Sequence, residues 1–192
     1  MIYRAIIFDF FGVVGQSTYQ LVGEDYTYTE AQNAQLHDLH KAFDNGFVGD
    51  QEFLQTYARI IGLPYEKFIK KYYTSEQRFR NSYAVLALVE SLKKDYKVGL
   101  LSNVGQDAYT KFIEPIVHHF DEVVTSYDAQ LAKPERAIFE LTAHKLGVDV
   151  SECIMIDDSE SNCEGARAAG MQAICFTTLD NLKQTLRIYL IQ

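Results

Sequence analysis

Cysteine and positive charge are both scarce in this 192-residue sequence. The three cysteines, Cys153, Cys163 and Cys175, are odd in number and form no Cys-X-X-Cys pair. A disulfide framework and a cysteine zinc site are therefore disfavoured, and a reducing cytoplasm is indicated. Lysine and arginine number 18 against 26 aspartate and glutamate, a net charge of −8, which argues against nucleic acid or an anionic membrane as partner. A phosphorylated small molecule is still compatible, because a local cation can reverse the sign at one site.

Long apolar runs are also missing. No run approaches the roughly 18 residues of a membrane span, and the apolar start of the chain is too short for a signal-peptide core and is interrupted by Asp9. Apolar residues nevertheless make up 47% of the chain, which is enough for the core of one domain, or of one domain with a sizeable insertion. The sequence therefore predicts a soluble, cytoplasmic globular protein.

The apolar pattern predicts alternating strands and helices over most of the chain. Continuous apolar runs such as 3–8 suit strands buried on both faces of a sheet, and the spacing of Val85, Leu88 and Leu92 is that of an amphipathic helix. Strands are expected at 3–8, 96–101, 122–125, 153–156 and 172–176, and helices at 85–92, 106–119, 134–146, 162–169 and 179–189. This alternation predicts an α/β fold with a Rossmann-like, doubly wound parallel sheet.

One block, residues 17–82, departs from this alternation. It is rich in Tyr, Gln, Lys and Asp, and its apolar residues recur at helical spacing, as at Phe53 and Tyr57. We therefore predict a helical insertion at 17–82, within an α/β core formed by residues 1–16 and 83–192.

The notable residues inside the insertion indicate structural roles more than catalytic or binding roles. Asp50 is expected to cap one helix and Gly62 to end it. The many tyrosines favour a small helical bundle packed with aromatic rings over an aromatic substrate box. His37 and His40 lie one helical turn apart, but no third metal ligand accompanies them.

Polar residues stand at the ends of three predicted strands. Asp9 follows the first, Ser102 and Asn103 follow the second, and Asp157 and Asp158 follow a later one. Ligands of open parallel sheets bind outside the carboxyl ends of the strands, so these side chains are expected to meet in one crevice. Three carboxylates there repel one another unless a cation joins them, and their hard oxygen atoms suit Mg²⁺.

A lysine adds fixed positive charge to this set. Lys133 precedes Pro134 at a predicted helix start. A carboxylate, a metal, hydroxyl and amide donors and an ammonium together suit a phosphoryl group, and an aspartate can then act as nucleophile to form an aspartyl-phosphate that water hydrolyses. Each residue alone is also ordinary turn or capping chemistry, so it is their shared placement that favours a functional site.

These segments resemble the four ordered motifs of the haloacid dehalogenase-like hydrolase superfamily. The resemblance covers nearly the whole core and extends to the subgroup with a helical cap between the first two motifs, where residues 17–82 lie. The motif residues are Asp9-Phe10-Phe11-Gly12-Val13-Val14, Leu101-Ser102-Asn103, Lys133-Pro134 with Ile138-Phe139, and Ile156-Asp157-Asp158-Ser159 with Asn162 and Gly165-Ala166.

The resemblance implies a role for individual residues. Asp9 would be the nucleophile, and Ser102 and Lys133 would hold the phosphoryl oxygens of a small phosphorylated metabolite. The residues it places at the substrate are Phe11, Gly12 and Asn103. The residues it assigns to Mg²⁺ are Asp9, the backbone carbonyl of Phe11, Asp158, and, in support or through water, Asp157 and Asn162.

Phe11 departs from the family pattern. Phosphatases of the family carry a second aspartate at this position as general acid and base, and losing such help typically costs 10²–10⁴-fold in rate. One hypothesis is a Mg²⁺-dependent phosphatase whose substrates, such as sugar 1-phosphates or acyl phosphates, have leaving groups that need little protonation.

Two alternatives follow from the same residue. The protein could bind phosphate ligands in a regulatory role without turning them over. It could also be a metal-independent 2-haloacid dehalogenase, because these relatives carry an aromatic residue at the Phe11 position, although the acidic pair Asp157 and Asp158 counts against this. A phospho-receiver domain is rejected, because its acceptor aspartate lies on a middle strand and no large helical insertion follows its first strand.

Overall fold

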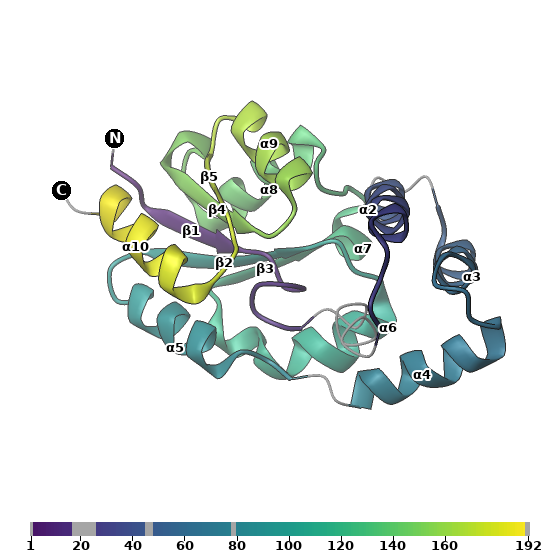
Figure 1. Ribbon diagram of the computed structural model, residues 1–192. Helices are drawn as coiled ribbons and strands as arrows, with labels where there is room; N and C mark the ends of the chain where they lie inside the picture. Colours follow the sequence, from purple (N-terminus) through teal and green to yellow (C-terminus); the bar gives the residue numbers. More distant parts are fainter. Residues whose placement is uncertain (1, 17–25, 45–47, 78–79, 191–192) are drawn as a thin grey trace. The chain divides into compact units, whose positions relative to one another are not determined.

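The computed structural model of the chain describes residues 2–16, 26–44, 48–77 and 80–190. The chain divides into two compact units, residues 1–15 with 81–192 and residues 16–80 (Figure 1). Residue 17, the expected start of the insertion, lies outside the described residues. Within the described ranges, no helix has the length and apolarity that crossing a bilayer requires.

The first unit contains a parallel sheet of five strands in the order β3-β2-β1-β4-β5. The strands are β1 (Ala5–Phe8), β2 (Lys97–Ser102), β3 (Glu122–Thr125), β4 (Cys153–Asp157) and β5 (Gln172–Cys175). Every residue of the central strand β1 and of β4 is buried, because helices cover both faces of the sheet. The predicted α/β fold with a Rossmann-like sheet is confirmed.

Helices flank this sheet on both faces, with α8 and α9 on one side and α5 on the other (Figure 1). Helical elements of the unit include α5 (Tyr83–Leu92), α7 (Ser126–Ala129), α8 (Arg136–Leu146), η3 (Val150–Glu152), α9 (Glu160–Ala169) and α10 (Leu179–Leu190). On the first face, Ile138 and Phe139 of α8 and Ala166 of α9 are buried against Ile7 and Met155 of the sheet. This packing fixes the helix starts relative to the strand ends.

Several predicted helix boundaries are wrong. Helices α5 and α9, for example, begin at Tyr83 and Glu160, each two residues earlier than predicted. The stretch expected as one helix at 106–119 consists of a short α6 (Gln106–Ala108), a π-helical η1 (Tyr109–Ile113) and a 3₁₀-helical η2 (Glu114–His119). Pro115, in the first turn of η2, has no N–H to continue an α-helical ladder. Helix α8 begins at Arg136 with Glu135 as its N-cap, so Lys133 lies in the preceding turn.

The second unit contains α2 (Glu30–Asp44), α3 (Asp50–Ile60) and α4 (Tyr65–Gln77). Phe53, Tyr57 and Phe68 are buried in its core, as expected for a bundle packed with aromatic rings. Gly62 ends α3 with a φ of +73°. The expected cap at Asp50 is wrong, because Gly49 holds the N-cap position and Asp50 is the first helical residue.

His40 is part of this aromatic core. Its ring lies edge-on to Phe53 and Tyr57, at centroid distances of 5.1 and 5.9 Å. Burial, followed by the charge of His37, lowers the pKa of His40 to about 4. At neutral pH the ring is therefore uncharged, which suits packing.

Candidate active site

The polar residues at the strand ends meet as the sheet topology requires. Strands β2, β1 and β4 are neighbours and parallel, so their carboxyl ends share one edge. Asp9 directly follows β1, and its N–H donates to the carbonyl of Ile156 at 2.8 Å. Ser102 and Asp157 are the last residues of β2 and β4, and both are buried. Asp158 follows β4 and is exposed.

Lys133 forms the electrostatic centre of this edge. Its side chain is 1% exposed, and its Nζ lies 2.7 Å from Asp9 Oδ1 and 2.6 Å from Asp157 Oδ2. Burial alone lowers the pKa of Lys133, but the charges of Asp157 and Asp9 outweigh it and hold this pKa above its ordinary value. The lysine therefore stays charged and bridges two buried carboxylates.

The surroundings of Asp9 disfavour its charged form, whereas those of Lys133 favour the charged form of the lysine. Burial, followed by the charge of Asp157, raises the pKa of the Asp9 carboxyl well above its ordinary value, and Lys133 offsets only part of this. Asp158 adds a further, smaller repulsion. The one ammonium of Lys133 contacts two of the three carboxylates, Asp9 and Asp157, and a further cation would relieve the remaining repulsion at Asp9.

The turn that carries Lys133 is held from two sides. The side chain of Asn103 accepts a hydrogen bond from the Lys133 N–H at 2.9 Å and donates one to the Lys133 carbonyl at 2.8 Å. On the other side, α9 approaches the turn so closely that a Cβ added at Gly165 would lie 2.5 Å from the Pro134 carbonyl oxygen. Asn103, expected beside the substrate, thus positions the lysine in this structure.

The Asp157 carboxylate accepts hydrogen bonds from three donors. Its Oδ2 accepts from Lys133, and its Oδ1 accepts from the Ser159 N–H at 2.9 Å and from Asn162 Nδ2 at 3.1 Å. These bonds fix the start of α9 against the end of β4. The Oδ1 of Asn162 is buried and has no hydrogen-bond partner among the described residues, which leaves one oxygen acceptor available to a cation or its water.

Gly12 allows Asp158 to come close. Gly12 has a φ of +86°, and a Cβ at this position would overlap the Asp158 carboxylate. Each of Asp9, Asp157 and Asp158 offers an oxygen, and these oxygens lie within 4.8 Å of one another. Such an all-oxygen set fits a hard divalent cation such as Mg²⁺.

Phe11 directs its ring into an aromatic cluster. Its centroid lies 4.8 Å from that of Phe10 and 6.0 Å from that of Phe112 in η1, both in edge-on arrangements. The ring has no proton to exchange, so position 11 supplies no acid or base. The contact of Phe11 with Phe112 and the close approach of Gly165 to Pro134 could not be predicted from the sequence, because each joins segments far apart in the chain.

Comparisons with known proteins point to one family. Residues 3–170 match the family model described as haloacid dehalogenase-like hydrolase. Phosphatase MT3486 of Mycobacterium tuberculosis is 32% identical over 138 residues, which cover 68% of this chain and 64% of that protein. Glyceraldehyde 3-phosphate phosphatase of Methanothermobacter thermautotrophicus is 34% identical over 90 residues, which cover 45% and 40% of the two chains. The matched regions thus span less than two thirds of either relative.

A solved structure has the same fold. The magnesium-bound HAD-hydrolase YfnB of Bacillus subtilis matches with a TM-score of 0.70 at 16% identity, over 98% of this chain and 99% of that chain. The sequence match extends from before β1 to the end of α9, and so includes all four motifs. This chain therefore belongs to the haloacid dehalogenase-like hydrolase family.

Proposed function

We propose that this protein is a Mg²⁺-dependent phosphatase that acts on a small phosphorylated metabolite through an aspartyl-phosphate at Asp9. The observation that carries the proposal is the buried contact of Asp9 with Lys133, beside two further carboxylates at the same sheet edge. Family membership supports hydrolase chemistry, and two relatives are named as phosphatases, one of them for glyceraldehyde 3-phosphate.

The acidic set would hold the metal. Asp9, Asp158 and the backbone carbonyl of Phe11 would bind Mg²⁺, with Asp157 and Asn162 in support or through water. The ion would neutralise charge on the phosphoryl oxygens and on the carboxylates around them. Two observations support this assignment: the three carboxylates lie close together, and the buried Asn162 Oδ1 has no hydrogen-bond partner in the part of the chain that the structure describes.

The chain's own residues would carry the two chemical steps. A carboxylate oxygen of Asp9 attacks the phosphorus, and the bond from phosphorus to the leaving oxygen breaks as the new bond forms. Ser102 and Lys133 would hold the phosphoryl oxygens during this transfer. A water oxygen then attacks the same phosphorus, the bond to Asp9 breaks, and inorganic phosphate leaves with the carboxylate restored.

Phe11 limits which leaving groups the substrates can have. The leaving oxygen must receive a proton, and the ring at position 11 has none to give. We propose that the preferred substrates have leaving groups that need little protonation, such as sugar 1-phosphates or acyl phosphates, or that they bring their own acid. The insertion at 17–82 would act as a cap that excludes water and selects the substrate. The three cysteines are free thiols, which supports a cytoplasmic location.

Release of inorganic phosphate from a panel of phosphorylated metabolites, with and without Mg²⁺, tests the proposal. Wild type should turn over at least one member, and Asp9→Asn should abolish this, whereas Asp180→Asn, the same change at an exposed position on α10, should not. Phosphate-ligand binding without turnover would instead identify a regulatory protein. Halide release from 2-haloacids without metal would identify a dehalogenase.

A further inference from the structure

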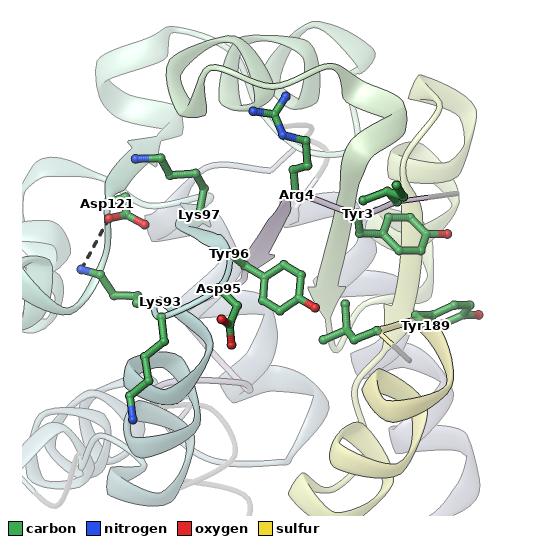
Figure 2. Close-up of a pocket in the computed structure, with 11 residues that line it drawn as sticks. Tyr3, Arg4, Lys93, Asp95, Tyr96, Lys97, Asp121 and Tyr189 are labelled. Carbon is green, nitrogen blue, oxygen red and sulfur yellow. Dashed lines mark ion pairs between the residues drawn. The ribbon is translucent and has the colours of Figure 1, made fainter. Parts of the chain in front are cut away.

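A cavity lies at the opposite end of the sheet from the carboxylates. It has a volume of about 530 Å³ and is lined by residues that precede β1 and β2, by Asp121 before β3, and by the end of α10 (Figure 2). Lys97 starts β2 and Ser102 ends it, which at 3.3 Å per residue separates the two ends by about 17 Å. The cavity is therefore distinct from the candidate active site, and its volume is in the range of small-molecule sites.

The lining is positively charged although the whole chain is acidic. Four cationic side chains, those of Arg4, Lys93, Lys94 and Lys97, stand against the two acidic ones of Asp95 and Asp121. Such a local excess in a chain of net charge −8 favours an anionic ligand.

Part of this positive charge is only weakly compensated by nearby carboxylates. Lys93 lies 3.7 Å from Asp121, but the other oxygen of Asp121 already accepts from the Val98 N–H at 2.8 Å. Arg4 pairs loosely with Glu152 at 3.4 Å and is 59% exposed. The side chain of Lys97 has no hydrogen-bond or ion-pair partner among the described residues. Arg4 and Lys97 can thus turn to an anion at little cost.

Aromatic rings form the other side of the cavity. Figure 2 shows Lys93 and Lys97 on one side, Tyr3 and Tyr189 on the other, and Arg4 and Tyr96 between them. The rings of Tyr3 and Tyr189 meet edge-on at 5.9 Å.

The position of one ring is further fixed. The Tyr189 hydroxyl accepts a hydrogen bond from Gln172 Nε2 at 2.8 Å. Held rings offer a planar ligand a stacking surface, while the guanidinium and ammonium groups opposite bind phosphate.

We propose that this cavity is a second binding site for a nucleoside phosphate, with its base against the tyrosines and its phosphates at Arg4 and Lys97. The division of the lining into an aromatic and a cationic side carries the assignment, because a ligand with a planar ring at one end and an anion at the other satisfies both. Neither inorganic phosphate nor an uncharged nucleoside would do so.

Nuclear magnetic resonance titration in metal-free buffer tests this site with adenosine 5′-diphosphate as probe, and with pyrophosphate and adenosine as partial probes. The diphosphate should bind with a submillimolar dissociation constant and shift the amides of residues 3–4 and 93–97. Pyrophosphate and adenosine should each bind at least tenfold more weakly. Equal affinity for pyrophosphate, shifts confined to residues 9–12 and 157–159, or no binding at millimolar concentration would overturn the proposal.

Variants separate the contribution of each side of the cavity. Arg4→Ala/Lys97→Ala should weaken diphosphate binding at least tenfold and leave phosphatase turnover unchanged, and Tyr96→Leu should weaken the diphosphate but not pyrophosphate. Lys145→Ala, which removes an exposed charge on α8 outside the cavity, should keep wild-type affinity. Unchanged affinity in the double variant, with its amide spectrum otherwise intact, would refute the site.

Discussion

Replacement of Lys133 by methionine tests the buried ion pairs most directly. Methionine keeps the apolar stem of the side chain but removes the ammonium that lies 2.7 Å from Asp9 and 2.6 Å from Asp157. Two carboxylates are then left buried and facing each other without a cation. Removing one partner of a buried ion pair typically costs about 3–5 kcal/mol, and we expect Lys133→Met to lose stability in this range.

Hydrogen exchange of the β1 and β4 amides, measured for wild type and variant, reports the free energy of unfolding of this unit separately from the helical one. A double variant adds a second readout. Asp157→Asn in the Lys133→Met background removes one of the two unpaired charges, and it should recover at least about 1 kcal/mol through this coupling.

The matched control is Arg136→Met. Arg136 pairs with Glu140 at the same short distance, 2.6 Å, but the two side chains are 66% and 46% exposed. Exposed pairs one helical turn apart contribute only about 0.3–0.5 kcal/mol. If Lys133→Met lowers the free energy of unfolding no more than Arg136→Met does, or if the double variant recovers no stability, the reasoning is refuted. Burial then does not make the Lys133 ion pairs more stabilising than an exposed pair.

Three further predictions follow from single positions. Phe11→Asp should raise phosphate release from alkyl phosphates by up to about 10²-fold, the lower range for a general acid, and leave acyl phosphates unaffected; steady-state kinetics on both classes decides this. Gly12→Ala places a Cβ on the Asp158 carboxylate in a backbone with φ of +86°, and it should weaken Mg²⁺ binding by calorimetry while Gly105→Ala, in open space, does not. The pKa of His40 falls from 6.5 to about 4 on folding, so the unfolded chain binds more protons between these values. The helical unit should therefore be fully stable above pH 6.5 and lose up to about 3 kcal/mol as pH falls toward 4; hydrogen exchange in α3 should show this loss in wild type and not in His40→Gln.

The local pattern of apolar residues was sufficient to predict the parallel sheet and the edge of it at which the candidate site lies. Strands such as β1 and β4 are short apolar runs, because both of their faces are covered. Strands alternating with helices imply a parallel sheet, and such sheets gather their carboxyl ends at one edge. The sequence alone therefore predicts that Asp9, Ser102 and Asp157 lie at the same edge of the sheet.

Helix boundaries were less predictable, because they depend on weak local competition. Residues 106–119 have the apolar spacing of one helix, but three short helical segments, α6, η1 and η2, form there instead. Pro115 lies in this stretch, and Phe112 packs against Phe11. The start of α8 at Arg136 likewise follows from Glu135 adopting an extended backbone at the N-cap.

The sequence by itself determined which residues lie at the sheet edge and how acidic that edge is. Only the tertiary structure decided how these residues interact: Lys133 bridges Asp9 and Asp157, and Asn103 holds the backbone of Lys133. It alone also formed the cavity at the other end of the sheet, which joins segments as distant as Arg4 and Tyr189. The physical reason is the distance along the chain between the residues involved. Apolar periodicity depends on neighbouring residues and can be read from the sequence. Ion pairs, side-chain hydrogen bonds to the backbone and cavities form where the packed sheet and helices bring distant segments within a few ångströms of each other.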